Sequence, residues 1–252
     1  MTPLELLALI GFFLIVRVAL GLRPEPLPVT AATGSPDARR GPSTRTVIRE
    51  YLDAFIVAGL VALLLITFVV RTFFIPSGSM EPTLMIGDVL LVNEFEYRLT
   101  KPHHGDIVVF KPPMVSSSDY IKRLIGAPGD TLRVHAGIVY RNGEALVEPY
   151  IAEKPNYELE IKNYGIYVDG SRLDPQIANI PPKAKWSAPD KIPDGYYYMM
   201  GDNRTNSEDS HAWGFAQTDG TFDSGQRKGE KANFTGHAFL VFFPFNRIRI
   251  LH

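Results

Sequence analysis

Ser79 is the first residue of this chain that could act as a nucleophile, because it lies on a short loop stiffened by proline and glycine. Gly78 precedes it, and Pro76 and Pro82 flank it. Such residues favour a rigid turn that can expose a hydroxyl, and the backbone N–H groups of the turn could stabilise an oxyanion. Taken alone, the segment is equally typical of an ordinary turn after an apolar stretch. A second group is therefore needed before the loop predicts catalysis.

Lys122 is the candidate for that second group. It lies in a strand-like run, 120–125, whose alternation places Lys122 on one face and Arg123 on the other. Both faces are otherwise apolar, so at least one of the two cations is expected in a dry environment. Desolvation lowers the pKa of a lysine, whereas arginine stays protonated, so Lys122 is the better candidate for a general base. A Lys–Arg pair at a sheet edge is the alternative interpretation.

A third polar segment, 201–214, is dense in Asp, Asn and Ser. A calcium-binding EF-hand loop would need Gly at its sixth position and Glu at its twelfth. Counted from the first Asp of the segment, those positions hold Ser207 and Trp213, which argues against calcium. His211 and Asp209 could belong to a Ser–His–Asp triad, but neighbours in sequence rarely converge in that way. No metal site is predicted.

The composition narrows the class of protein. The 252 residues include 26 Lys plus Arg against 27 Asp plus Glu, a net charge of −1. A nucleic-acid-binding protein would normally show a basic excess or stripe, and neither is present. The absence of cysteine excludes disulfides, thiolate metal sites and a cysteine nucleophile.

Two apolar segments near the N-terminus are interpreted as transmembrane helices. The first, within 1–22, carries one charge in its apolar run, Arg17, which can reach the interface, and it lacks the basic start of a cleaved signal sequence. The second, within 53–71, is uncharged from position 54 to position 70 and would be about 26 Å long as a helix. Between them, 23–52 holds five arginines against three acids, which favours a cytoplasmic linker and an exported remainder.

The exported part is expected to be mainly β. Short runs rich in β-branched and aromatic residues, separated by Gly, Pro and Asp, occur at 88–92, 106–110, 120–125, 195–200 and 238–243. The dipeptide Asn142-Gly143 between strand-like flanks predicts a hairpin with a type I′ turn. Residues 152–195 are polar, proline-rich and irregular, so we interpret them as an insertion or subdomain on the main sheet.

Four sequence boxes then occur in a fixed order after the second apolar segment. They read Ser-Gly-Ser-Met-Glu-Pro-Thr-Leu at 77–84, Gly-Asp-Ile-Val-Val-Phe at 105–110, Tyr-Ile-Lys-Arg followed by Gly-Ala-Pro-Gly-Asp within 120–130, and Gly-Asp-Asn-Arg-Thr-Asn-Ser-Glu-Asp-Ser at 201–210. Any one box would be weak. Together, with the apolar helix before them, they resemble the bacterial signal peptidase I (leader peptidase) family.

The resemblance implies that 72–130 and 196–252 form one catalytic β-domain and that 131–195 form an inserted, smaller β subdomain. It also implies roles for several residues. Ser79 is similar to the family's nucleophile and Lys122 to its general base. The Ser77 hydroxyl and the Ser79 backbone N–H resemble the oxyanion hole. Ser207 is similar to the serine that orients the lysine, and Tyr120 would pack on the methylene stem of the lysine.

The same resemblance implies one supporting residue and reveals one departure from the family's sequence pattern. Asp209 resembles the carboxylate that braces the last box, but the family commonly has Arg two positions later, where this chain has His211. An Asp–Arg salt bridge would then become an Asp–His contact. Ile75, Met80 and Leu84 are candidate walls of two shallow apolar pockets that would select the small residues of a signal peptide bound as an added strand.

The expected function is that of a membrane-anchored serine endopeptidase that removes N-terminal signal peptides from exported preproteins with a Ser–Lys dyad. Activity should rise with pH through an apparent pKa of about 7–8. Signal peptides and membrane lipid are the expected partners, at the outer (periplasmic) side of a bacterial cytoplasmic membrane, with no cofactor and no nucleic acid. Two alternatives stay open: a dedicated Ser–Lys peptidase of a conjugation or pilus system, and a non-catalytic membrane-tethered β-domain that binds partners.

Overall fold

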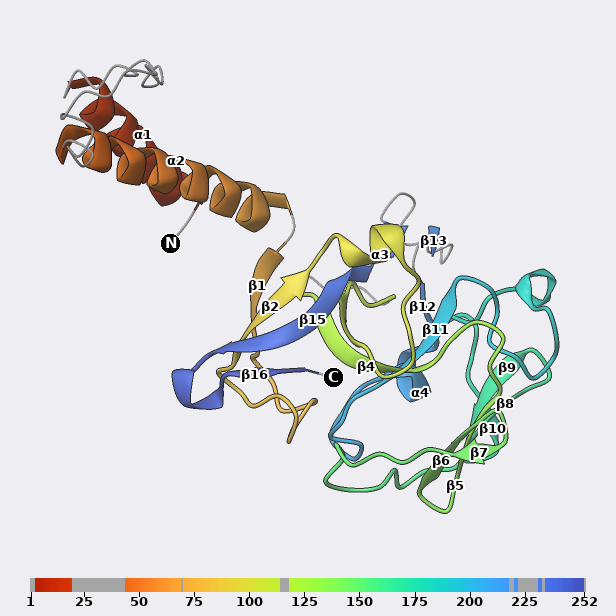
Figure 1. Ribbon diagram of the computed structural model, residues 1–252. Helices are drawn as coiled ribbons and strands as arrows, with labels where there is room; N and C mark the ends of the chain where they lie inside the picture. The colour runs from red at the N-terminus through yellow and green to blue at the C-terminus, as the bar shows by residue number, and fades with distance from the viewer. Residues whose placement is uncertain are drawn as a thin grey trace, which may run out of the picture. The chain divides into compact units, whose positions relative to one another are not determined.

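The computed structural model of the chain describes residues 3–19, 44–68, 70–113, 118–217, 220–221, 231–232 and 234–251. The chain divides into two compact units, the second of which begins at Val70. The first unit is helical, and the second is built around β-sheets (Figure 1). The expected mainly β fold is therefore confirmed.

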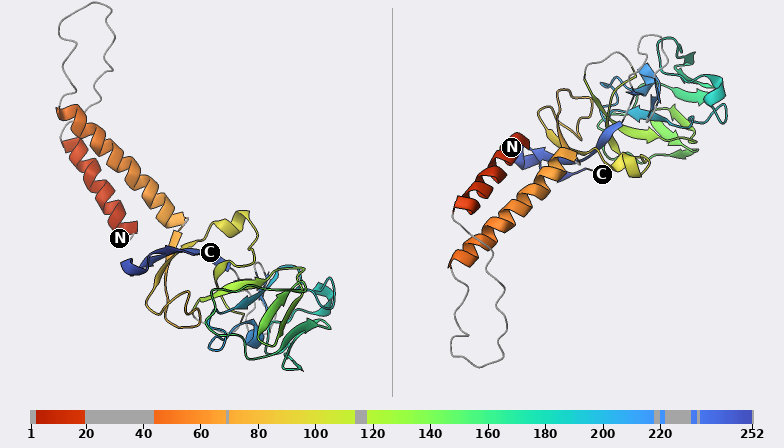
Figure 2. Two further views of the ribbon diagram at one scale, coloured as in Figure 1. Left: turned by 60° about the horizontal axis from the view of Figure 1, so that its bottom comes forward. Right: turned by 90° about the horizontal axis from the view of Figure 1, so that it is seen from above.

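The first unit consists of two helices, α1 (Pro3–Ala19) and α2 (Thr44–Phe68), that pack side by side (Figure 2). The rings of Phe13 and Phe55 stack between them with centroids 5.7 Å apart. One turn further along α1, Arg17 forms an ion pair with Asp53 of α2, with Nε 2.6 Å from Oδ1. In the described part of the chain, neither helix combines the length and the apolar character that crossing a membrane requires.

The bounds of the second helix differ from the predicted 53–71. Helix α2 starts earlier because Arg49 and Asp53, one turn apart, pair at 3.6 Å on the helix surface and continue the helix among charged residues. It ends earlier because Val70 already belongs to a strand. The end of the predicted linker, 44–52, is therefore helical, whereas its earlier part, 23–43, lies outside the described residues.

An eight-stranded antiparallel sheet forms the centre of the second unit. Its strand order is β1-β2-β15-β3-β4-β11-β12, and β16 pairs with β15. The strands are β1 (Val70–Phe74), β2 (Val89–Asn93), β3 (Ile107–Phe110), β4 (Tyr120–Gly126), β11 (Tyr196–Met200), β12 (Ala216–Gln217), β15 (Phe234–Phe243) and β16 (Arg249–Ile250). All five strand predictions fall on members of this sheet. Strand β1 was not predicted, because its apolar residues continue those of the preceding helix.

A second sheet of six strands holds only residues from the predicted insertion, 131–195. Its order is β10-β9-β8-β5-β6-β7. The strands are β5 (Leu132–His135), β6 (Ile138–Arg141), β7 (Glu144–Ala145), β8 (Leu159–Lys162), β9 (Gly165–Val168) and β10 (Ser171–Arg172). Asn142 and Gly143 between β6 and β7 have φ of 54° and 83°, so the predicted type I′ hairpin is confirmed.

Short elements complete the second unit. They are the helices α3 (Glu96–Leu99) and α4 (Ser210–Trp213), the 3₁₀ turns η1 (Lys183–Lys185) and η2 (Phe245–Arg247), and the ribbon of β13 (Gly220–Thr221) with β14 (Lys231–Ala232). In Figure 1 the long β15 crosses the large sheet, and the six-stranded sheet lies beside β4 and β11.

Two apolar clusters matter for the site. One joins the sheets, because Ile125 of β4 and Tyr198 of β11 pack with residues of β5, β6 and β8. The two sheets therefore share a core. The other cluster gathers residues of β2, β15 and β3 and includes Ile75, Met80 and Leu84 from the loop that carries Ser79.

Candidate active site

The loop between β1 and β2 positions Ser79. Its two ends are joined by backbone hydrogen bonds, from Ile75 N to Asp88 O and from Gly87 N to Ile75 O, both 2.9 Å. Met80, immediately after Ser79, is fully buried in the core. The loop is thus closed at its neck and anchored by an apolar side chain beside the half-buried serine, which fixes the direction of the hydroxyl.

Lys122 lies in β4, a central strand paired with β3 on one side and β11 on the other. It is directly opposite Val108 in the register, and its side chain is 4% exposed. The Lys122 Nζ donates a hydrogen bond of 2.8 Å to the Ser79 Oγ. The two residues that the sequence singled out, 43 positions apart, therefore meet in the fold.

Burial lowers the pKa of Lys122 to about 8, well below the ordinary 10.5 of a lysine. The negative charges of Asp209, Glu208 and Asp202 act in the opposite direction and do not cancel this effect. Desolvation penalises the ammonium because it removes the water that stabilises the charge. At pH 7, roughly a tenth of this amine is consequently unprotonated, far more than for an ordinary lysine.

Three other residues were predicted to assist Ser79 and Lys122, and the structure gives the position of each. The Lys122 Nζ is 5.7 Å from the centroid of the Tyr120 ring, in cation–π range. Ser77 is exposed on the same loop as Ser79. The Ser207 Oγ is buried and finds no hydrogen-bond partner among the described residues, so its predicted role in orienting the lysine stays a prediction.

Arg123, the neighbour of Lys122, faces a different partner. Its Nε and Nη2 donate to the two carboxylate oxygens of Asp202 at 2.9 and 2.8 Å, and both side chains are almost completely buried. The Thr83 hydroxyl, from the Ser79 loop, donates to the same carboxylate. Asp202 therefore ties β4 to the loop, a role that its place in the 201–210 box did not reveal.

The 201–210 segment also holds the Ser79 loop through its backbone. Asn203 N donates to Ser79 O at 3.1 Å, and Asn203 Nδ2 donates to Gly78 O at 2.9 Å. A side chain at Gly201 would collide with Ser79 O, since its Cβ would lie 2.4 Å away. Only glycine therefore allows the segment to approach the nucleophile so closely.

Asp209 is fully buried and accepts a hydrogen bond from Gly201 N at 3.1 Å. Its other oxygen contacts the backbone N and the ring Nδ1 of His211. Burial alone would lower the pKa of His211, but the hydrogen bond to Asp209 and its charge raise that pKa above the ordinary 6.5. The expected Asp–His contact is confirmed.

Comparison with known proteins decides the family. The model of a family described as signal peptidase, peptidase S26, matches residues 48–224. The chain belongs to this signal peptidase family. It is accordingly a serine endopeptidase of the signal peptidase I type.

Individual relatives agree with this assignment. A probable signal peptidase I-1 of Synechocystis sp. is 38% identical over 82% of this chain and 88% of its own length. A signal peptidase I of Pseudomonas aeruginosa is 39% identical over 65% of this chain and 62% of its own length. A solved structure of a signal peptidase I from Enterococcus faecalis V583 is 30% identical and covers 47% of this chain and 91% of that chain, with a TM-score of 0.32.

The three candidate pocket residues of this signal peptidase serve as core in the structure. Ile75, Met80 and Leu84 are 1%, 0% and 0% exposed. A side chain without exposed surface cannot touch a bound peptide in this conformation. Their burial instead holds the Ser79 loop on the sheet, and their role as pocket walls stays a prediction that requires the loop to move.

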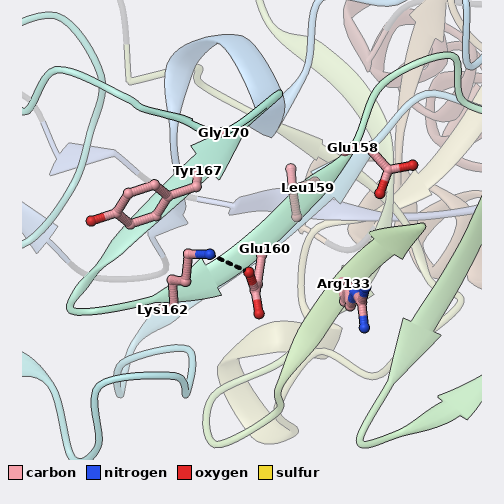
Figure 3. A pocket seen from close by; sticks show the side chains of 7 residues that line it. All are labelled: Arg133, Glu158, Leu159, Glu160, Lys162, Tyr167 and Gly170. Atoms are coloured by element: carbon pink, nitrogen blue, oxygen red, sulfur yellow. Dashed lines mark hydrogen bonds and ion pairs between the residues drawn. The ribbon is translucent and has the colours of Figure 1, made fainter.

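A shallow depression elsewhere in the domain lacks the groups needed for peptidase chemistry. It lies on the six-stranded sheet and is lined by charged side chains such as Arg133, Glu158 and Lys162 (Figure 3). Lys162 is paired with Glu160 there. None of the residues that line it is a serine or a cysteine. Within the described residues, moreover, no group of three His, Asp or Glu side chains could hold a metal ion.

Proposed function

We propose that this chain is a membrane-anchored serine endopeptidase that removes N-terminal signal peptides from exported preproteins, with Ser79 as nucleophile and Lys122 as general base. The observation that carries the proposal is the 2.8 Å hydrogen bond between the Lys122 Nζ and the Ser79 Oγ, made by a buried amine. Signal peptides are proposed as the substrate because the relatives are named as signal peptidases.

The proposed reaction starts with the neutral amine of Lys122. The Ser79 hydroxyl donates its proton to Nζ while Oγ attacks the carbonyl carbon of the scissile peptide bond. The oxyanion accepts hydrogen bonds from the Ser79 backbone N–H and the Ser77 hydroxyl. The protonated lysine then donates its proton to the departing amine, and a water molecule hydrolyses the acyl-enzyme with Lys122 again as base.

The structure supports this scheme through preorganisation. The nucleophile is fixed by the closed neck of its loop and by the hydrogen bond from Asn203 N to Ser79 O. The base is fixed by the central strand β4. Because both groups are already within hydrogen-bond distance, little reorganisation is needed when the substrate binds. In this scheme Ser207 and Asp209 support the lysine, and Tyr120 lies beside its amine.

Membrane anchoring is part of the proposal. We propose that α1 and α2 hold the chain at the cytoplasmic membrane of a bacterium, with the β-domain on the periplasmic side. Their apolar side chains and the arginine-rich segment between them favour this arrangement. From Arg71 to Ser79 the chain can span at most about 28 Å, so cleavage is expected close to the membrane surface, where a signal peptide leaves the lipid.

The test is cleavage of unrelated purified preproteins by the full-length chain. Replacing Ser79 or Lys122 with Ala should reduce kcat by about a thousand-fold or more, because each removes one member of a coupled pair. The matched controls are Ser171→Ala and Lys162→Ala, which change an exposed serine and a partly exposed lysine on the six-stranded sheet. Efficient processing by the folded Lys122→Ala variant would refute the assignment, and processing of a single precursor would favour a dedicated peptidase.

A further inference from the structure

Asp209 and His211 form a hydrogen-bonded pair that takes no direct part in the proposed reaction. The Asp209 carboxylate has no exposed surface, and it acts on Lys122 as the largest of the charges that favour the ammonium. His211 contacts this carboxylate through both its backbone N and its ring Nδ1. A proton on His211 therefore determines whether Asp209 is a compensated or an uncompensated negative charge.

One face of the His211 ring is covered by a residue of the insertion. Tyr157, which precedes β8, stacks on it with ring centroids 4.6 Å apart and an interplanar angle of 18°. Tyr157 is itself buried and belongs to the core shared by the two sheets. The imidazole is thus held at one edge, through Nδ1, by Asp209 and on one face by the Tyr157 ring.

Among the charged groups around Asp209, His211 is the one whose charge can change and so alter the compensation of that carboxylate. Glu208 and Asp169 also face it and favour its protonated form, as Asp209 does. Near Lys122, Asp202 is already neutralised by Arg123. Arg204 and Glu148, which lie near Tyr157, pair with each other through a buried guanidinium.

We propose that His211 is a positioning residue for the Ser79–Lys122 pair, which fixes Asp209 and, through its own charge, sets how strongly that carboxylate retains the proton on Lys122. The inference rests on the proposed function. When His211 is protonated, Asp209 is compensated and Lys122 gives up its proton more readily. When His211 is neutral, Asp209 stabilises the ammonium, and the dyad needs a higher pH to act. The inserted sheet thereby contributes to catalysis through the Tyr157 stack.

The experiment compares the pH dependence of kcat/KM for preprotein cleavage by the full-length wild type, His211→Gln and His211→Arg. Glutamine keeps an N–H donor for Asp209 but no charge, so the acid limb should move up by roughly half to one pH unit. At pH 7 the rate should then fall about three- to ten-fold, while the plateau above pH 9 is largely kept. Arginine keeps a permanent charge, so its midpoint should lie at or below that of the wild type.

The matched control is His135→Gln. His135 also pairs with a carboxylate, that of Glu158 at 2.8 Å, but this pair is exposed on the six-stranded sheet. Its profile should coincide with that of the wild type. The thermal midpoint of each variant checks that it is folded, and if His211→Gln does not fold, the His211→Arg profile decides alone.

An acid limb of His211→Gln that stays at the wild-type pH, or a rate loss equal at every pH, would overturn the inference, as would an upward shift in His211→Arg. Failure of the proposed function looks different, because cleavage by the wild type would then persist in Ser79→Ala. If cleavage by the wild type requires Ser79 but the His211→Gln profile is not shifted, only the proposed role of His211 is refuted.

Discussion

Two adjacent cations on β4 have different chemical fates because different groups face them. Arg123 meets the buried carboxylate of Asp202 and forms a two-point ion pair. Lys122 meets the hydroxyl of Ser79. Since a hydroxyl cannot compensate an ammonium as a carboxylate does, burial dominates at Lys122 and its pKa falls to about 8. One strand thus supplies a structural cation and a candidate base from consecutive residues.

The depressed pKa of Lys122 predicts a pH-dependent effect of Lys122→Met on stability. The folded value, about 8, lies below the ordinary 10.5, so the stability linked to this group is complete above 10.5 and is lost as the pH falls through 8. The difference of about 2.5 units corresponds to about 3 kcal/mol. We therefore expect the free energy of unfolding of Lys122→Met at pH 7 to exceed that of the wild type by about 1–3 kcal/mol, which raises its unfolding temperature. At pH 10.5 this difference should disappear.

Thermal unfolding of the full-length chain at the two pH values measures the effect. Lys162→Met is the matched control, because that lysine is partly exposed and paired with Glu160. An equal change for Lys122→Met at both pH values would show that its ammonium is not destabilised by burial.

At the scale of elements, the buried ion pair between β4 and the 201–210 segment is expected to hold the site together. The register of β4 with β11 places Arg123 opposite Met200, which brings Asp202 to the guanidinium. Replacing Asp202 with Ala leaves that guanidinium buried without a counter-charge. The free energy of unfolding should fall by about 3–5 kcal/mol.

A double-mutant cycle with Arg123→Met tests this prediction by chemical denaturation. The double variant should be more stable than the sum of the single effects predicts, because it removes both charges. Asp190→Ala changes an exposed acid and serves as the control. Additive effects of the two substitutions would contradict the coupling.

The C-terminal segment braces the Ser79 loop through a second ion pair. Arg247 donates to both oxygens of Asp88 at 2.8 and 3.0 Å, and Asp88 in turn accepts a hydrogen bond from Met85 N at 2.9 Å. Burial alone would raise the pKa of Asp88, but these bonds lower it below the ordinary 3.8. The stability from this pair is therefore present above that value and lost as the pH falls below it.

Arg247→Ala should accordingly destabilise the protein by about 1–3 kcal/mol at pH 7, because a buried carboxylate loses a charged partner. The difference from the wild type should shrink at pH 3, because the stability that this pair contributes is lost as the pH falls below 3.8. Thermal unfolding at the two pH values is the measurement, with the exposed Arg133→Ala as control. A difference that persists unchanged at pH 3 would mean that the ion pair is not its cause.

The sequence was informative where local preference and tertiary structure agree. Strands such as β3 and β11 are short runs of β-branched or aromatic residues between Gly, Pro and Asp, so their positions could be predicted. Strand β1 could not be separated from the apolar helix before it, because its strand geometry depends on pairing with β2. The link between Arg123 and Asp202 was hidden for the same reason, since it depends on the β4–β11 register.

At the scale of the whole molecule, the proposed anchor makes a separate prediction. Val57 and Val61 of α2 expose 59% and 54% of their surface, as lipid-facing side chains would. Replacing both with Asp should remove apolar surface that the proposed anchor presents to lipid, and the chain should move to the soluble fraction. Alkaline carbonate extraction of bacterial membranes measures this. Val147→Asp, at an 89% exposed valine of the β-domain, is the control. Carbonate-resistant membrane association of the double variant would contradict anchoring by α2.

The division into two sheets also shows what sequence can and cannot say about the whole molecule. Composition indicated an insertion only at 152–195, whereas the family resemblance extended it to 131–195, and the strands of the smaller sheet lie within the wider range. Its contribution to the site was not visible, because Tyr157 reaches His211 only through the folded contact between the sheets.

The pH dependence of Ser79 acylation tests the central claim most directly. The full-length chain would be treated with a serine-directed acylating probe, and modification of Ser79 would be followed by mass spectrometry in single-turnover conditions. If the unprotonated amine of Lys122 activates the hydroxyl, the acylation rate should rise about ten-fold per pH unit and level off near the pKa of about 8. A rate that stays constant from about pH 6 to about pH 10 would contradict the account.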